Sequence, residues 1–200
     1  MLKTKKKYLA LILARRGSKR LKNKNILKLG KKRLISRTLE NLIKIKYLFN
    51  NILVSSDSKI VEKISKQKKL IFVKRPKYLA HGNVSSEAAT IHAIKFYNKK
   101  FEPVDYVVLF QVTSPFRKNS TVKKAIKLSK KCSNKQVVAV NKKNLKPNGV
   151  IYLTPVKLLQ KFNSFSYKNF VPLIISSKKE SLDIDYKKDF LKAEKFLNKF

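Results

Sequence analysis

The pattern that most constrains the fold is an alternation, along 200 residues, of short apolar blocks with longer stretches of helical periodicity. The blocks have the length of strands, and a strand buried on both faces is a continuous apolar run. We expect strands at 9–14, 51–55, 70–73, 105–111, 136–140, 149–153 and 171–175. This βαβα order predicts an α/β domain whose mostly parallel sheet is covered by helices on both faces.

Between the blocks, apolar residues recur at helical spacing. Ser85 or Ser86 is placed to cap the third helix, and Asn119 or Ser120 the fourth. A last helix is expected within 187–200. The four earlier helical faces are indicated by Leu34, Leu39, Leu42 and Ile43; by Ile60, Val61 and Ile64; by Ala88, Ile91, Ala93 and Ile94; and by Val122, Ala125, Ile126 and Leu128.

The charge of the chain is extreme, since 49 Lys and Arg stand against 11 Asp and Glu, a formal net charge of +38. Such a charge would suit a nucleic-acid-binding protein, whose cations neutralise phosphates. The cations are spread over the whole chain, however, and no zinc-finger or RNP-type motif accompanies them. Nucleic acid is therefore not the expected main partner.

The N-terminal apolar stretch 8–14 follows a run of lysines but does not fit a secretory signal peptide. It is too short and leads directly into Arg15 and Arg16. The single cysteine, Cys132, excludes an intramolecular disulfide. No apolar run approaches the roughly 20 residues that a membrane-spanning helix needs. We expect a cytoplasmic protein without a membrane partner.

Two clusters of charged residues stand out from the lysine-rich background. Arg15, Arg16 and Arg20 fall within six residues after the first expected strand, and three Asp fall within 183–189. Ligands of open α/β sheets bind beyond the carboxyl ends of the strands. The first cluster is placed for such a site.

The loop at 14–25 has the features of a phosphate-binding loop. Gly17 allows a sharp turn or a close approach of the backbone to a ligand. Backbone N–H groups, with Arg15, Lys19 and Lys24, could hold several phosphate oxygens. The loop matches neither the Walker A pattern nor the Gly-x-Gly-x-x-Gly dinucleotide turn.

This loop also matches a family pattern. Residues 14–25 fit Ala-Arg-x-Gly-Ser-Lys-x-Leu-x-x-Lys-Asn at every fixed position. Together with segments that follow in order, it resembles the CMP-N-acylneuraminate (sialic acid) cytidylyltransferase family over most of the chain. Those segments are Ile-Leu-Val-Ser-Ser-Asp-Ser at 52–58, Arg75-Pro76, Leu79-Ala80, Ser85-Ser86, Phe-Gln-Val-Thr-Ser-Pro-Phe-Arg at 110–117, Asn-Gly-Val-Ile-Tyr at 148–152, Ser-Leu-Asp-Ile-Asp at 181–185 and Asp189-Phe190.

The resemblance implies a Rossmann-like nucleotidyltransferase fold, a three-layer α/β sandwich similar to glycosyltransferase A, in one domain over 1–200. It implies transfer of CMP from CTP to an acidic nine-carbon sugar, with Mg²⁺ as cofactor. Arg15, Lys24 and Asp185 are then the expected catalytic residues. The implied nucleotide contacts are Ala14, Arg15, Gly17, Ser18, Lys19, Lys24, Asn25, Arg75 and Ser86; the sugar contacts are Gln111 and Asn148; and the Mg²⁺ ligands are Asp183 and Asp185.

In an extended segment, Asp183 and Asp185 would share one face while Ile184 packs inward. Simpler interpretations remain beside the functional ones. Asp183 and Asp185 could be N-terminal acids of the last helix, and Asn148 with Gly149 could form a plain turn.

One departure from the family concerns the link at 141–147. It is seven residues long, where the resemblance implies a longer dimerisation insertion. The oligomeric state and the identity of the sugar therefore stay open. Two other functions remain: the related 3-deoxy-manno-octulosonate (Kdo) cytidylyltransferase, and a weakly active, basic homologue that binds nucleotide or RNA.

Overall fold

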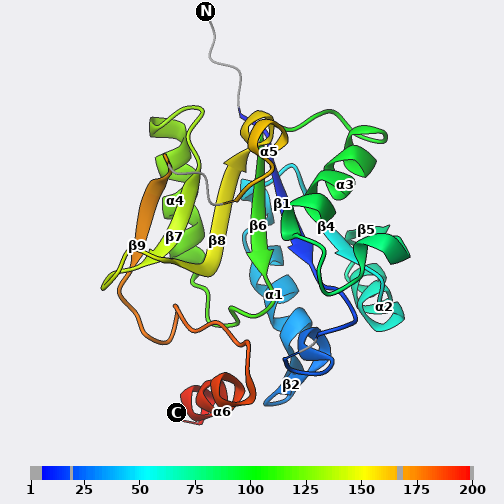
Figure 1. The fold of residues 1–200 in the computed structure, drawn as a ribbon, viewed down its shortest axis with the longest axis vertical. Coiled ribbons are helices and arrows are strands. Elements are labelled where there is room, and N and C mark those ends of the chain that lie inside the picture. Colours follow the sequence, from blue (N-terminus) through cyan, green and yellow to red (C-terminus); the bar gives the residue numbers. More distant parts are fainter. Residues whose placement is uncertain (1–5, 19, 166–168, 199–200) are drawn as a thin grey trace, which may run out of the picture.

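The computed structural model describes residues 6–18, 20–165 and 169–198. Its centre is a seven-stranded sheet in the order β5-β4-β1-β6-β8-β7-β9 (Figure 1). All seven expected strands are confirmed, with ends displaced by two residues or fewer. Their bounds are β1 Tyr8–Leu13, β4 Asn51–Ser56, β5 Ile71–Lys74, β6 Tyr106–Gln111, β7 Val137–Asn141, β8 Pro147–Pro155 and β9 Val171–Ile175.

The sheet is mostly parallel, as predicted. β1 pairs in parallel with β4 and β6, β4 with β5, and β7 with β9. β8 is the exception, because it runs antiparallel to both β6 and β7. The carboxyl ends of β1, β4, β5 and β6 therefore lie along one edge, where the residues after each strand can form a site.

Helices cover both faces of this sheet (Figure 1). Along β1, Leu9 and Leu11 pack with residues of α3 and α5, while Ala10 and Ile12 pack with residues of the other helices. This alternation follows from the period of two in a strand. The helices are α1 Leu34–Ile43, α2 Lys59–Gln67, α3 Ser86–Asn98, α4 Asn119–Lys131, α5 Val156–Phe162 and α6 Lys187–Leu197. No described helix is long and apolar enough to cross a membrane.

Short elements escaped the sequence prediction. The hairpin of β2 Lys28–Leu29 and β3 Lys32–Arg33 is too short to give a periodic pattern, and so is α5. Ile60, expected on a buried helical face, is 42% exposed. Asn148 and Gly149 lie inside β8 rather than in a plain turn, and β7 and β8 are joined through the tight connection after Asn141.

Ser85 caps α3 as predicted, with its Oγ accepting from the backbone N–H of Ala88 at 3.2 Å. The predicted caps of α4, Asn119 and Ser120, are wrong. Lys118 is the N-cap residue and has no side-chain cap. The acceptor comes instead from Glu180, whose Oε1 accepts from the Lys118 N–H at 3.1 Å and from the Thr121 hydroxyl.

We expect Glu180→Ala to lower the free energy of unfolding by about 1–3 kcal/mol, because it leaves a buried hydroxyl and a helix N–H without their acceptor. Glu180 is 4% exposed, so water replaces it poorly. The measurement is urea denaturation beside Ser120→Ala, which removes the hydroxyl that local rules favour as the cap. Equal stability of the two variants would contradict this assignment.

Candidate active site

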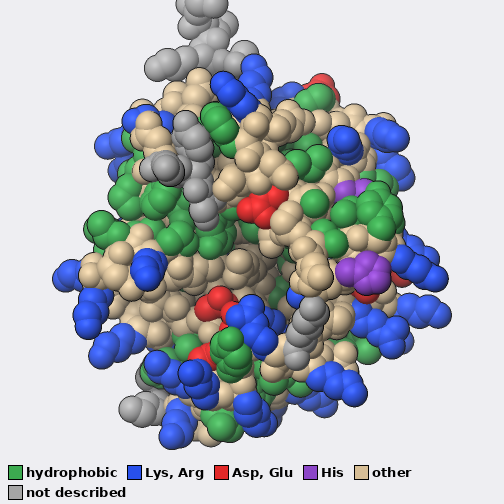
Figure 2. Space-filling model, in the orientation of Figure 1, with side chains coloured by type: hydrophobic (Ala, Val, Ile, Leu, Met, Phe, Trp, Pro, Cys, Tyr) green, Lys and Arg blue, Asp and Glu red, His purple; other side chains and the backbone are tan. Residues whose placement is uncertain are grey.

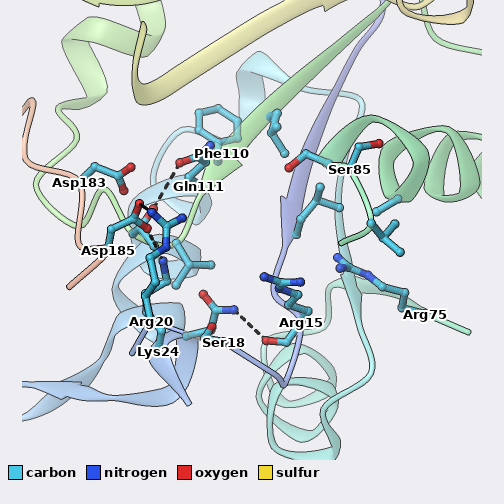
Figure 3. A pocket seen from close by; sticks show the side chains of 18 residues that line it. Arg15, Ser18, Arg20, Lys24, Arg75, Ser85, Phe110, Gln111, Asp183 and Asp185 are labelled. Atoms are coloured by element: carbon cyan, nitrogen blue, oxygen red, sulfur yellow. Dashed lines mark hydrogen bonds and ion pairs between the residues drawn. The ribbon is translucent and has the colours of Figure 1, made fainter. Parts of the chain in front are cut away.

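A cavity of about 280 Å³ lies at the carboxyl ends of β1 and β6 (Figure 3). The segment after β1 and the 183–185 segment contribute charged side chains, and the start of α3 contributes hydroxyls. The predicted site residues that line it are Arg15, Ser18, Lys24, Asn25, Arg75, Ser86, Gln111, Asp183 and Asp185. Ala14, Gly17 and Asn148 are not lining residues, and Lys19 lies outside the described residues.

Hydrogen bonds fix the loop after β1. The Asn25 side-chain amide donates to the Arg15 carbonyl at 2.9 Å (Figure 3). Arg15 Nη1 in turn donates to the His81 carbonyl at 2.9 Å. Asn25 is thus a support of the loop as well as a lining residue. Gly17 does not have a left-handed φ, and an added Cβ there would meet no atom within 4 Å. The sharp turn is therefore not what this glycine supplies.

Arg75 and the start of α3 form the end of the cavity opposite the Asp residues (Figure 3). Arg75 is 5% exposed, and its Nη2 donates to the Ser55 carbonyl at 3.1 Å. Burial lowers the pKa of Arg75 to about 10, with Asp57 opposing that shift, so the guanidinium is still charged at neutral pH. This end combines a fixed cation with the N-terminus of a helix and the Ser86 side chain.

The acidic end of the cavity has the predicted alternation. Ile184 is fully buried and donates its N–H to the Thr113 carbonyl at 2.9 Å, while Asp183 and Asp185 line the cavity. Burial raises the pKa of Asp183, and a hydrogen bond with Thr113 opposes that rise. The helix-acid interpretation is wrong for these two residues, because Asp189 occupies that position in α6 and accepts from the Tyr186 N–H at 2.8 Å.

Asp185 connects the acidic end with the loop after β1. Its Oδ1 lies 2.6 Å from Lys24 Nζ, and its Oδ2 lies 2.9 Å from Arg20 Nη1. Arg20 also lies over the Tyr186 ring, 5.2 Å from its centroid. Arg20 was not predicted as a site residue, and its place in the arginine cluster after the first strand is the signal that could have found it.

Gln111 and Gly149 pack together at the end of β6. Gln111 Oε1 accepts from the Thr113 hydroxyl at 3.3 Å. A Cβ on Gly149, whose φ is +77°, would lie 2.7 Å from Gln111 Oε1 and 3.4 Å from Asp183 Oδ2. Because Gly149 has no side chain, the Gln111 side chain can occupy this space. Asn148 accepts from the Val150 N–H at 3.2 Å, and its Nδ2 is buried without a partner.

Arg117 is a buried support of this side of the site. It is 4% exposed, and its Nη2 donates to the Gln111 carbonyl at 2.9 Å while its Nε donates to the Val150 carbonyl. Burial lowers the pKa of Arg117 to about 9, with Glu180 and Asp183 opposing that shift. Arg117 belongs to the sequence motif at 110–117, but the sequence alone did not show that it lies buried under the cavity.

The donor set fits one hard cation held jointly with a ligand. Within the described residues, no group of three or more His, Cys, Asp or Glu side chains could hold a metal. Asp183 Oδ1, however, is buried without a hydrogen-bond partner beside the cavity. Two carboxylates with phosphate oxygens and water are a usual environment of Mg²⁺.

On the face drawn in Figure 2, the surface charge does not single out another site. Lys and Arg side chains are spread over this face, many of them along its outline, and several acidic side chains lie nearer its middle. On this face the cations do not form the single stripe that nucleic-acid grooves favour.

Comparison with known proteins identifies the class. A family described as cytidylyltransferase matches residues 9–172. The chain therefore belongs to the cytidylyltransferase family and is a nucleotidyltransferase enzyme, as the sequence predicted.

Its curated relatives are synthases of CMP-activated nonulosonic acids. It is 29% identical over 229 residues to the CMP-N,N'-diacetyllegionaminic acid synthase of Legionella pneumophila, with 96% of each chain covered. It is 29% identical over 164 residues to the pseudaminic acid cytidylyltransferase of Campylobacter jejuni, covering 82% of this chain and 70% of the relative. It is 36% identical over 148 residues to the N-acylneuraminate cytidylyltransferase of Escherichia coli, covering 72% of this chain and 33%, about a third, of that relative.

Solved structures share the fold. The CMP:2-keto-3-deoxy-manno-octonic acid synthetase complexed with CTP has a TM-score of 0.76 at 15% identity, covering 96% of this chain and 98% of that one. A cytidylyltransferase of Leptospira borgpetersenii has a TM-score of 0.71 at 20% identity, covering 98% and 88%. The predicted nucleotidyltransferase fold is confirmed.

Proposed function

We propose that this enzyme transfers CMP from CTP to a nonulosonic acid, a nine-carbon α-keto acid sugar, and releases pyrophosphate. One observation carries the proposal: the cations of the loop after β1 and the carboxylates of Asp183 and Asp185 line one cavity at the carboxyl ends of the strands. The relatives that the chain matches along its length support the class of sugar.

In this proposal, different parts of the cavity bind the triphosphate, the nucleoside and the sugar. Arg15, Lys24 and the backbone of their loop bind the triphosphate. Arg75 and Ser86 hold the nucleoside at the start of α3. Gln111 orients the sugar beside Asp183, so that the anomeric hydroxyl lies next to the α-phosphate.

The reaction needs positioning and charge neutralisation rather than a protein nucleophile. The sugar hydroxyl gives its proton to solvent water, and its oxygen bonds to the α-phosphorus. The bond from that phosphorus to the bridging oxygen of the β-phosphate breaks, and pyrophosphate leaves with the electron pair. Arg15 and Lys24 stabilise the charge that develops on pyrophosphate.

We propose Mg²⁺ as the cofactor, held by Asp183 and Asp185. The buried, unpartnered Oδ1 of Asp183 supports this assignment, because an orphaned carboxylate oxygen is costly unless a ligand meets it. When bound, Mg²⁺ acidifies a hydroxyl and polarises a phosphate. The protein's part is to keep the two carboxylates on one face through the buried Ile184.

The test is release of pyrophosphate by purified protein with CTP, Mg²⁺ and a panel of legionaminic, pseudaminic and sialic acids, each at saturating concentration. We expect release with CTP and at least one of these acids, and much less with ATP, GTP or UTP. Release with none of the three acids would overturn the proposal. Adding 3-deoxy-manno-octulosonate (Kdo) to the same panel tests the Kdo cytidylyltransferase function, which is supported by the shared fold alone.

Three expectations stay predictions. They are that the family's dimerisation insertion is shortened at 141–147, that the chain forms a single domain over 1–200, and that the protein is cytoplasmic. A purely nucleotide- or RNA-binding role has no separate observation in its favour. The general positive charge is consistent with attraction of two anionic substrates, CTP and a sugar acid.

A further inference from the structure

Both oxygens of Asp185 are held by cations that belong to the phosphate-binding loop. Lys24 Nζ lies 2.6 Å from Oδ1 and Arg20 Nη1 lies 2.9 Å from Oδ2, so the carboxylate is clamped from two sides. The Lys24 side chain is 14% exposed and that of Arg20 56% exposed, which makes Arg20 the outer member of the pair. The Arg20 guanidinium also makes a cation–π contact with the Tyr186 ring.

The neighbouring carboxylate, Asp183, is not neutralised in this way by any described residue. Asp183 Oδ1 is buried and has no hydrogen-bond partner. Asp183 therefore keeps one carboxylate oxygen open, whereas Asp185 is neutralised by two cations of the loop that is proposed to bind the triphosphate. A phosphate competes well with a carboxylate for a guanidinium or ammonium group, since both anions accept charge-assisted hydrogen bonds.

We propose that Arg20 and Lys24 are exchangeable counterions of Asp185, and that Arg20 is a further triphosphate-binding residue. When the triphosphate enters the loop, both cations leave Asp185 for phosphate oxygens, and the freed carboxylate becomes available to a divalent cation. Anion binding by the loop and metal binding by Asp185 are thereby coupled, and such coupling is reciprocal. This inference rests on the proposed function in one respect, the identity of the anion.

The first test measures binding of CTP without metal, by calorimetry in excess EDTA. Asp185→Asn removes the competing carboxylate, so we expect it to bind metal-free CTP at least about fivefold more tightly than the wild type, the lower end of couplings between linked sites. Asp183→Asn is the matched control. It removes the same charge from the same cavity but leaves the clamp on Asp185 intact, so its gain should be clearly smaller. Equal affinities of the two variants would overturn the exchange.

The second test needs no nucleotide. Titration of Mn²⁺, followed by electron paramagnetic resonance, should show higher affinity for Arg20→Gln than for the wild type, because half of the clamp is gone. Arg16→Gln is the control from the same loop. The recorded contact of Arg16 with Asp57 is made by its backbone nitrogen, at 2.7 Å, and does not depend on the side chain. Equal Mn²⁺ affinity of the two variants would refute the counterion role of Arg20.

The two tests separate this inference from the proposed function. If no variant binds CTP, with or without metal, the proposed function fails. The Mn²⁺ comparison then decides alone whether Arg20 competes with a divalent cation for Asp185.

Discussion

Asp185→Asn should lower the rate of pyrophosphate release at least about 100-fold while leaving the fold intact. Loss of one preorganised donor to the charge that develops in a transition state typically costs about 10²–10³ in turnover, and we expect loss of a proposed metal ligand to cost at least as much. Asn keeps the size of the side chain but removes the charge that Lys24 and Arg20 neutralise and that Mg²⁺ is proposed to use. The backbone hydrogen bond of Asp185 to Asp189 Oδ2, 3.1 Å long, is unaffected by the change, so α6 should still dock.

The measurement is steady-state pyrophosphate release, with circular dichroism and urea denaturation as checks of the fold. Asp105→Asn is the matched control. Asp105 precedes the amino end of β6, where it accepts from the Lys7 N–H, so the same charge is lost at the edge opposite the cavity. We expect near-normal turnover for Asp105→Asn. Near-normal turnover for Asp185→Asn would reject the proposed metal role of this residue.

The same variant should then show two opposite effects. Turnover should fall because the proposed Mg²⁺ loses a carboxylate ligand, whereas metal-free CTP should bind more tightly because Arg20 and Lys24 lose the carboxylate that competes with phosphate for them. A general disruption of the site would lower both the turnover and the affinity for metal-free CTP. A fall in turnover together with a rise in CTP affinity therefore distinguishes a specific exchange of partners from a general loss of the site's structure.

The sheet could be predicted because its strands carry their own signal. Strands such as β1 and β6 are buried on both faces and are nearly continuous apolar runs, which few other structures produce. The Asp-Ile-Asp alternation was equally local, since the period of two in an extended segment fixes which side chains share a face. Ile184 is accordingly buried and its two neighbours line the cavity.

The failures concern partners that are distant in sequence. The acceptor at the start of α4 is Glu180, 62 residues beyond the Lys118 N–H that it binds, so local capping rules pointed to Asn119 and Ser120 instead. Arg20 pairs with Asp185, which is distant in sequence. The arginine cluster indicates the loop, but nothing local shows which of its cations contacts that carboxylate. Local chemistry thus predicts elements and alternation, while tertiary packing decides which of many similar side chains is used.

Arg117 is the clearest case of such a tertiary role, and its replacement should have the largest effect on stability. Burial disfavours its charge, with the fields of Glu180 and Asp183 opposing. The guanidinium nevertheless donates to two carbonyl oxygens, that of Gln111 at the end of β6 and that of Val150 within β8. It also lies 5.0 Å from the centroid of the Phe110 ring. Removing the side chain takes the guanidinium donor from both carbonyls and opens a cavity beneath Gln111. The Gln111 carbonyl then keeps the longer bond from the Ser114 N–H, at 3.4 Å.

We expect Arg117→Ala to lower the free energy of unfolding by about 2–4 kcal/mol. The loss of two guanidinium hydrogen bonds and a new cavity lower the stability, and relief of the buried charge offsets part of that loss. The KM for the sugar should rise more than that for CTP, because Gln111, the proposed sugar contact, loses the guanidinium that donates to its carbonyl. Arg37→Ala is the control. Arg37 also makes two hydrogen bonds to a carbonyl, that of Leu29, but it is only half-buried and lies on α1 away from the cavity. Its loss should cost about 1 kcal/mol or less. Equal losses in the two variants, or an unchanged sugar KM in Arg117→Ala, would show that Arg117 does not support the acceptor side of the site.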